Sequence, residues 1–359
     1  MTEDVLEPAS PKKSRTRRSS PAAVKLEDVA RLAKVSTATA SRVINSPSSV
    51  TEKTRQRVEK AIAELGWIPH GAAQALASLR TRTIGALIPT LGHQTIAMML
   101  ESLQQSLGTA GYTLLLGRPD TAARERTVDQ AAKMIQNGVE CLVVMGEDHP
   151  PELFAMLEQR RIFHVIVYTV GAFGRTNCIG IDNFAEMSKM VRYLLKLGHQ
   201  SFGVIAADYT YNDRIRLRIN GISETLAGEG IAVRPQHFKV VPQWTIGCGR
   251  EGMRAILAEP MRPTAVICTN DYLASGAVIE ATASGVSVPK EISVSGFDDI
   301  ELASHIVPPL TTIHVPTQDM GRSIADYIIR SLDGEDIVLP VKLDSELIIR
   351  ASTAAPRRN

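Results

Sequence analysis

The segment from Ser36 to Asn45 carries small, hydrogen-bonding and basic side chains that suit the recognition of DNA. If a helix begins after Ser36, its outer face presents Thr37, Ala38, Thr39, Ser41, Arg42 and Asn45. Small side chains let a helix enter the major groove, where an arginine pairs with a guanine edge and methyl groups contact thymine. The pattern therefore indicates contacts with base edges and phosphates.

Two short helices joined by a tight turn are needed to position this face. Leu26, Val29 and Ala33 recur at helical spacing, and Ser36 is a suitable N-cap for the second helix. A third helix fits residues 51–65, because an apolar stripe runs through them and a glycine follows as a stop. The alternative is an ordinary helical hairpin without a nucleic-acid partner.

Basic residues are concentrated in the N-terminal part of the chain. The whole chain has 40 Lys+Arg and 38 Asp+Glu, but residues 10–82 hold 15 basic and 5 acidic residues. A basic head on an acidic body predicts that the head meets a polyanion while the body has another role. Residues 1–23, which include PKKSRTRRSSP, are predicted to be a disordered basic tail.

Residues 69–82 are predicted to be a hinge linker that follows a DNA-binding domain of residues 24–68. Pro69 blocks continuation of the third helix, and residues 72–77 form a short Ala-rich segment. A helix this short is not stable alone in water, so we expect it to fold on contact with DNA or a partner chain.

Residues 83–354 alternate apolar strands with amphipathic helices. Runs such as IGALIP, CLVVM, FGVIA and AVICT are typical of parallel sheets covered by helices on both faces. Roughly 270 residues are too many for one compact sheet. The pattern therefore predicts an α/β fold with two lobes, and ligands favour the cleft at the carboxyl ends of such strands.

Several classes of protein find no support in the sequence. There is no apolar signal-peptide core and no run of transmembrane length. The four cysteines and eight histidines lack metal-binding spacing, and no GxSxG, HExxH or Walker sequence occurs. We therefore expect a cytoplasmic protein without membrane contact, metal or cofactor.

The order of these parts resembles the lactose-repressor (LacI) family of bacterial transcription regulators, from about residue 24 to residue 354. The resemblance rests on LEDVARLAKVSTATASRVIN, VTEKTRQRVEKAIAELGWIP, PTAVICTNDYLASGA, ISVSGFDD and PPLTTI. It implies a helix-turn-helix head, a hinge helix and a two-lobed core like that of periplasmic binding proteins. It also implies a repressor, not an enzyme, that binds double-stranded operator DNA as a homodimer under the control of a small effector.

The resemblance assigns DNA contacts residue by residue. The family's DNA-contacting face corresponds to Ser36, Thr37, Ala38, Ser41, Arg42, Asn45 and, in the hinge, Leu76. Leu76 matches a leucine that wedges into the minor groove, a known way to unstack a base step. A leucine of the core or of a dimer contact is the alternative at that position.

The effector is expected between the lobes. Predicted contacts are Arg218, Trp244, Asn270, Asp271 and Asp298. Arg218 matches an arginine that grips effector hydroxyl or carboxylate groups, and a sugar or sugar acid is the predicted ligand. Core packing is an equal alternative for Trp244, and Arg214 and Arg216 are interpreted as solvated helix charges.

Two rival functions and one alternative assembly are compatible with parts of the sequence. Residues 247–252, GCGREG, fit the G-x-G-x-x-G pattern of an NAD-dependent enzyme, although PQWT separates them from the preceding strand. A periplasmic sugar-binding module would share the two lobes but not the basic head. Because only TAAPRRN follows the last apolar strand, SELIIRAS, a dimer is expected and not a tetramer held by a leucine-heptad tail.

Overall fold

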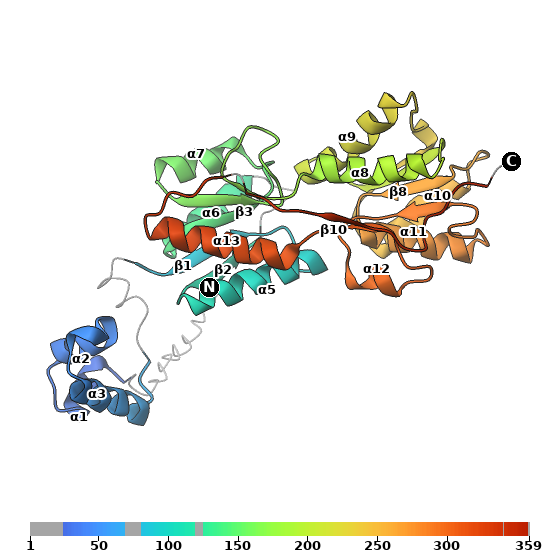
Figure 1. The fold of residues 1–359 in the computed structure, drawn as a ribbon. Helices are drawn as coiled ribbons and strands as arrows, with labels where there is room; N and C mark the ends of the chain where they lie inside the picture. The colour runs from blue at the N-terminus through green and yellow to red at the C-terminus, as the bar shows by residue number, and fades with distance from the viewer. Residues whose placement is uncertain (1–23, 69–79, 119–124, 340, 358–359) are drawn as a thin grey trace, which may run out of the picture. The chain divides into compact units, whose positions relative to one another are not determined.

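The computed structural model describes residues 24–68, 80–118, 125–339 and 341–357. The chain divides into two compact units, residues 1–81 and residues 82–359 (Figure 1). The predicted tail, residues 1–23, and most of the predicted hinge, including Leu76, lie outside the described residues. The predicted helical head and α/β core are confirmed.

The first unit is a three-helix head. Its elements are α1 (Leu26–Leu32), α2 (Thr37–Asn45), the 3-10 turn η1 (Pro47–Ser49) and α3 (Glu52–Leu65). Small and branched side chains from all three helices form its core: Val29, Ala30, Ala33, Ala40, Val43, Val58 and Ala61. Gly66 ends α3 with φ +58°, a left-handed conformation that glycine adopts without a Cβ penalty.

Hydrogen bonds inside the head fix the turn between α1 and α2. Ser36 caps α2, as predicted, since its Oγ accepts from the Thr39 amide at 3.1 Å. Arg57 of α3 donates from Nη2 to the Lys34 carbonyl at 2.8 Å and from Nε to the Ala33 carbonyl at 3.1 Å. These bonds occupy carbonyls that the end of α1 leaves unpaired, so the direction of α2 is set within the head.

The first lobe of the core contains a six-stranded parallel sheet of order β11-β5-β4-β3-β1-β2. Its strands are β1 (Thr83–Leu87), β2 (Thr113–Gly117), β3 (Val139–Met145), β4 (Phe163–Val167), β5 (Cys178–Gly180) and β11 (Val341–Lys342). Helices α5 (Gln94–Thr109) and α13 (Thr317–Leu332) cover one face, and α6 (Glu125–Gln136) and α7 (Pro151–Gln159) cover the other. Alternate residues of β1 therefore enter different clusters, Ile84 and Ala86 on one face and Leu87 on the other.

The second lobe contains a four-stranded parallel sheet of order β7-β6-β8-β9. Its strands are β6 (Phe202–Ala207), β7 (Phe238–Val241), β8 (Ala265–Cys268) and β9 (Ser293–Ser295). Helices α8 (Asn183–Lys196) and α9 (Asp213–Gly228) pack together, as do α10 (Ile246–Leu257) and α11 (Asp271–Ala283). The short elements η2 (Pro235–His237) and α12 (Glu301–His305) complete this lobe.

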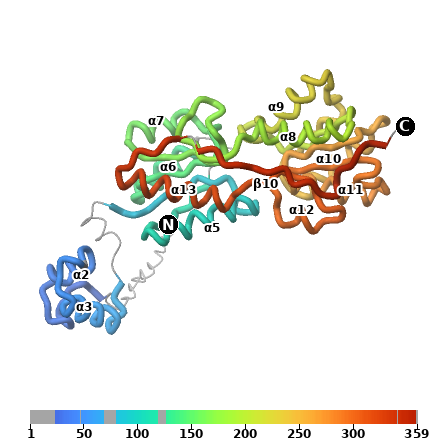
Figure 2. The backbone as a smooth tube through the Cα atoms, in the orientation of Figure 1, coloured from blue at the N-terminus to red at the C-terminus, as the bar shows by residue number. Residues whose placement is uncertain are grey.

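The chain passes between the lobes three times. The first passage follows β5, the second leads from β10 (Thr312–His314) to α13, and the third leads from β11 to β12 (Glu346–Ile348). Strand β12 pairs antiparallel with β10, so the last passages lie next to each other. Figure 2 shows the C-terminal segment, in red, running from the first lobe back along the second.

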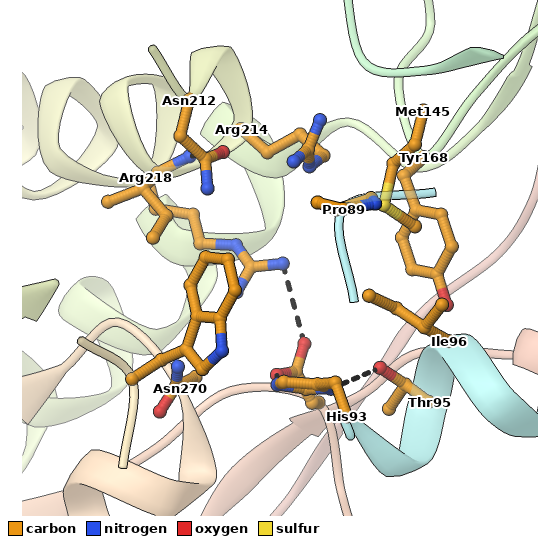
Figure 3. A pocket seen from close by; sticks show the side chains of 13 residues that line it. Pro89, His93, Thr95, Ile96, Met145, Tyr168, Asn212, Arg214, Arg218 and Asn270 are labelled. Atoms are coloured by element: carbon orange, nitrogen blue, oxygen red, sulfur yellow. Dashed lines mark hydrogen bonds and ion pairs between the residues drawn. The ribbon is translucent and has the colours of Figure 1, made fainter. Parts of the chain in front are cut away.

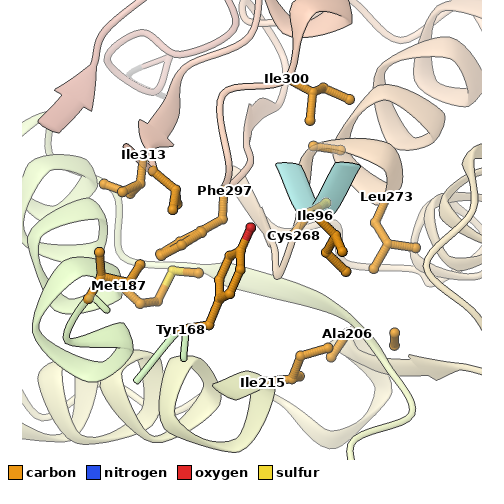
Figure 4. Close-up of a cluster of buried hydrophobic side chains, with 14 of the residues drawn as sticks. Ile96, Tyr168, Met187, Ala206, Ile215, Cys268, Leu273, Phe297, Ile300 and Ile313 are labelled. Carbon is orange, nitrogen blue, oxygen red and sulfur yellow. The ribbon is translucent and has the colours of Figure 1, made fainter. Parts of the chain in front are cut away.

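One apolar cluster continues from the first lobe into the second. Ile96 and Tyr168 of the first lobe belong to the same cluster as Ile215, Leu273 and Phe297 of the second (Figure 4). Burial of apolar area stabilises a contact by about 25 cal/mol per Å². The lobes are therefore joined by packing as well as by the chain.

The three glycines of the GCGREG segment lie inside α10 and not in a strand-to-helix turn. Thr245 caps this helix by accepting from the Cys248 amide at 3.2 Å. A Cβ on Gly249 would lie 2.2 Å from the Leu273 carbonyl oxygen of α11. Gly249 is therefore needed for close packing of α10 on α11, which gives it a structural role.

Two glycines of α10 provide a matched test. Gly249→Ala should destabilise the core by about 1–3 kcal/mol, because the new methyl group meets backbone. Gly247→Ala should be neutral or stabilising by up to about 1 kcal/mol, since its Cβ would lie no closer than 3.8 Å to Thr245 Oγ1 and alanine favours helix. Denaturant unfolding of both variants measures the difference, and equal effects would contradict this packing.

Candidate effector pocket and DNA-contacting face

The head presents the predicted DNA-contacting side chains on the outside of α2. Ser36, Thr37, Ala38, Arg42 and Asn45 are exposed, and Ser41 is half-buried. The Asn45 amide donates to Ser41 Oγ at 3.1 Å, which orders that edge of the helix. Within the described part of the chain, the Arg42 side chain makes no hydrogen bond or ion pair, so its guanidinium is available to a partner.

Two adjoining pockets form a cleft between the lobes of the core. The inner pocket has a volume of about 60 Å³ and the outer one about 600 Å³. They share Pro89, Asn212, Arg214 and Trp244, so they are two parts of one cleft. Their combined size falls in the range of small-molecule sites, and Figure 3 shows the side chains of the inner part.

Arg218 and Asp298 form a buried ion pair in the wall of the inner pocket. Arg218 Nη2 lies 3.4 Å from Asp298 Oδ1, and the two side chains are only 7% and 6% exposed. Arg218 also donates from Nε to Asn183 Oδ1 at 2.9 Å and from Nη1 to the Thr269 carbonyl at 2.7 Å. Its guanidinium carbon lies 3.6 Å from the centre of the Phe297 ring, a cation–π distance.

His93, the N-cap residue of α5, extends this network into the first lobe. Its Nε2 lies 3.5 Å from Asp298 Oδ2, and its Nδ1 lies 2.9 Å from Thr95 Oγ1. Burial lowers the pKa of His93. The charge of Asp298 raises this pKa, whereas the charges of Arg218 and Arg214 lower it further. His93 is therefore expected to be neutral at pH 7.

The lowered pKa of His93 predicts a loss of stability in acid. Between the ordinary histidine pKa of about 6.5 and the lower value in the folded protein, the unfolded chain binds more protons, so stability falls as the pH drops below about 6.5. Burial also lowers the pKa of His164 and His199. His93→Gln should therefore narrow, but not abolish, the difference in Tm between pH 7.5 and pH 5.5. An unchanged difference would assign the effect to the other two histidines.

Three helices begin at the inner pocket. The N-cap residues of α5, α9 and α11 are His93, Asn212 and Asn270, and all three line it. Asn270 Oδ1 accepts from the Leu273 amide at 2.9 Å, and Asn212 Oδ1 accepts from the Ile215 amide at 3.3 Å. The caps thus explain why these polar side chains are held where the strands end.

The predicted effector residues are brought together with one exception. Arg218, Trp244, Asn270 and Asp298 line the inner pocket. Asp271 does not, because it is fully buried and accepts from Thr312 Oγ1 at 2.6 Å and from the Ile300 amide at 2.9 Å. Burial, followed by the charge of Asp298, raises the pKa of Asp271. Its position is that of a structural residue that ties α11 to the segment before α12.

Some residues of the pocket were not predicted from the sequence, and the role of one was predicted wrongly. His93 and Asn212 were not predicted, although each precedes a helix in a cap position. The interpretation of Arg214 as a solvated charge was wrong, because its side chain is 13% exposed and lines both pockets. Arg216, in contrast, points elsewhere and pairs with Asp148 at 2.7 Å.

Polar contacts join the lobes around the cleft. The Glu147 amide of the first lobe donates to Asp213 Oδ2 of α9 at 2.8 Å. On the other side, the Glu301 amide donates to Gln94 Oε1 at 3.2 Å. A ligand that changes the separation of the lobes must therefore make or break bonds on both sides of the pocket.

Comparisons with known proteins agree with this arrangement. Residues 25–70 match the family described as bacterial regulatory proteins, lacI family, and residues 191–353 match a periplasmic binding protein-like domain. The HTH-type transcriptional repressor PurR of Escherichia coli O139:H28 (strain E24377A / ETEC) is 33% identical over 340 residues, which cover 92% of this chain and 96% of that protein. The chain belongs to the lacI family of bacterial regulatory proteins.

Solved structures of the family share the fold. The lac repressor dimer bound to operator and the anti-inducer ONPF has a TM-score of 0.83 and 27% identity over 93% of this chain and all of that chain. The transcriptional regulator CelR in complex with cellobiose has a TM-score of 0.66 and 26% identity over 92% of this chain and 99% of that chain.

Family membership decides between the functions that the sequence left open. The chain is a DNA-binding transcriptional repressor with an effector-binding core. The dinucleotide-dependent enzyme and the periplasmic sugar-binding module are therefore the wrong interpretations.

Proposed function

We propose that this repressor binds a palindromic operator as a homodimer through α2 and that a sugar or sugar acid in the interlobe cleft changes its operator affinity. The observation that carries the proposal is the inner pocket, where Arg218, Asn270 and Asp298 from separate segments converge between two lobes. A site built between two lobes is suited to convert ligand binding into a change in their separation.

The DNA contacts proposed for the head follow from its exposed face. Thr37 and Ala38 offer small apolar groups to thymine methyls, and Arg42 offers a fork to a guanine edge. Ser36, Ser41 and Asn45 are proposed to contact the backbone or neighbouring bases. The lac repressor has been crystallised as a dimer bound to its operator. Its structure supports a two-fold assembly for the present chain, which is related to it.

The hinge is proposed to connect effector and operator. Leu76 lies outside the described residues, so its proposed wedge in the minor groove rests on the resemblance alone. An effector shifts the balance of two states only by its differential affinity for them, typically 1–3 kcal/mol.

The polar character of the pocket supports a polyhydroxylated effector. The carboxylate of Asp298 accepts hydrogen bonds from hydroxyls, while the pocket's amides and guanidinium groups donate to their oxygens. Half-buried Trp244 lines both parts of the cleft, where its ring can cover a sugar face. CelR, a structural relative, was solved with cellobiose.

A location in the cytoplasm is proposed because the DNA that a bacterial repressor binds is there. No helix in the described part of the chain is both long enough and apolar enough to cross a bilayer.

A ligand screen tests the proposed effector class. Thermal shifts of the full-length protein with sugars, sugar acids and purines should give a sugar-type hit that stabilises the wild type. The same compound should not stabilise Asp298→Ala. A hit restricted to purines, or one that is indifferent to both Asp298→Ala and Arg218→Met, would contradict the proposed site.

A further inference from the structure

We propose that the effector is an acid, a polyhydroxylated carboxylate whose carboxylate group binds at the N-terminus of α9 between Arg214 and Asn212. The inference rests on the proposed function and narrows its ligand class. It starts from hydrogen-bond donors that have no partner and face the inner pocket.

The capping role of two asparagines fixes which of their atoms faces the ligand. A backbone amide only donates, so the atom of Asn212 that bonds the Ile215 amide is Oδ1, and that of Asn270 bonding the Leu273 amide is Oδ1 as well. The Nδ2 groups remain, and neither has a partner among the described residues. Both side chains are largely buried in the pocket wall, at 8% and 3% exposed, and offer donors to a ligand.

Arg214 offers a third donor group in a fixed position. Its Nη1 pairs with Asp213 Oδ1 at 3.1 Å, and Asp213 is itself held by the Glu147 amide at 2.8 Å. The other guanidinium nitrogens have no partner within the described ranges, and the side chain lines the cleft. An arginine that is held on one side presents the geometry that binds a carboxylate by two hydrogen bonds.

The backbone of the first lobe leaves room for this guanidinium. Gly146 has φ +79°, and a Cβ at this residue would lie 1.9 Å from Arg214 Nη1 and 2.5 Å from Asp213 Oδ1. Any larger residue would therefore displace both groups. Arg214 lies in the pocket because the residue that follows β3 is a glycine.

The acids at the inner pocket all have partners, so hydrogen-bond donors and no free carboxylate face the ligand near α9. Two arginines and one aspartate line the inner pocket, and that aspartate, Asp298, is paired with Arg218. Of the acids behind the wall, Asp213 is paired with Arg214, and Glu147 accepts from Thr169 Oγ1 and the Phe173 amide. In addition, three helix N-termini meet here, and each favours negative charge.

The pocket has two chemically different sides. Figure 3 shows Arg214 and Asn212 on one side and His93, which contacts Asp298, on the opposite side. A carboxylate at the α9 side leaves the ligand's hydroxyls to reach Asp298, an acceptor. The outer pocket shares Arg214 and adds Arg118 and Asp208, and its volume of about 600 Å³ leaves room for the rest of an acyclic or ring-shaped chain.

Matched ligand pairs test the inference. Isothermal titration of the full-length protein compares glucuronate with glucose and galacturonate with galactose, and glucose 6-phosphate serves as an anion without a carboxylate. At least one carboxylate should bind 10-fold or more tightly than the neutral sugar of the same skeleton. Arg214→Gln should lower that affinity at least 10-fold and remove the preference for the acid, and Gly146→Ala should do the same. Arg192→Gln, which changes an exposed arginine of α8, should leave both affinities unchanged.

Other outcomes separate the inference from the function on which it rests. If neutral sugars bind as tightly as their acids, or if only glucose 6-phosphate binds, the proposed carboxylate of the effector is contradicted. The proposal of a sugar-type effector is unaffected by either result. If Arg214→Gln weakens acid and neutral ligand equally, Arg214 is not the acid's partner and the inference is overturned. If none of these compounds binds and a purine does, the proposed effector class falls as well.

Discussion

Arg218→Met is expected to lower the free energy of unfolding of the core by about 3–5 kcal/mol. The change leaves Asp298 buried without its partner and also removes the hydrogen bonds to Asn183 and the Thr269 carbonyl. An unpaired buried charge costs several kcal/mol because neither water nor a counter-ion compensates it. Denaturant unfolding of the full-length protein, followed by a probe in the core, measures the loss.

A double variant shows whether the unpaired charge causes this loss. Arg218→Met combined with Asp298→Asn removes the charge, so it should recover part of the stability lost in Arg218→Met. A single variant that costs less than about 1 kcal/mol would contradict a buried pair and indicate a pair open to solvent. A double variant less stable than the single one would show that the unpaired charge of Asp298 does not cause the loss.

Arg42→Ala is expected to reduce discrimination between operator and random DNA by about 1–3 kcal/mol. Arg42 is exposed on α2 and free of ion pairs in the described part of the chain, which suits a bidentate contact with a base. Fluorescence anisotropy with a selected operator and with a scrambled duplex of equal length, at one salt concentration, measures both affinities.

An arginine of α1 is the matched control for this experiment. Arg31 is exposed and lies 3.1 Å from Asp28, so Arg31→Ala should weaken binding to both duplexes equally or leave both unchanged. If Arg42→Ala also weakens both duplexes equally, Arg42 contacts phosphate and reads no base.

The head was predictable from the sequence because its signals are local. Ser36 as the cap of α2 and Gly66 as the end of α3 were both predicted, and the structure confirms both. The contacts of Arg57 with the turn were not predicted, since residues separated by more than 20 positions show no pattern that links them.

The core was predictable in its units but not in its connections. Strand runs such as FGVIA and AVICT fall where β6 and β8 lie. Neither α13 nor the return of β11 to the first sheet was predicted, because a hydrophobic period along the chain does not reveal which lobe a segment joins. The three passages of the chain between the lobes are set by tertiary packing, which the sequence pattern does not show.

The site, like the core, was predicted from the sequence only in part. Arg218, Asn270 and Asp298 were found because they follow strands or match the family, and the pocket unites them. Asp271 is adjacent to Asn270 in sequence, but the first turn of α11 directs it into the core. Arg214 was missed because its burial depends on Gly146, a residue of the other lobe.

The most direct test of the account measures operator affinity with and without the effector found by the ligand screen. Saturating effector should change the operator Kd of the wild type by about 5–150-fold, corresponding to a coupling of 1–3 kcal/mol. The operator Kd of Asp298→Ala should not respond to the same concentration. An operator Kd that is unchanged in the wild type at saturation, or that changes equally in Asp298→Ala, would contradict control of DNA binding through the cleft between the lobes.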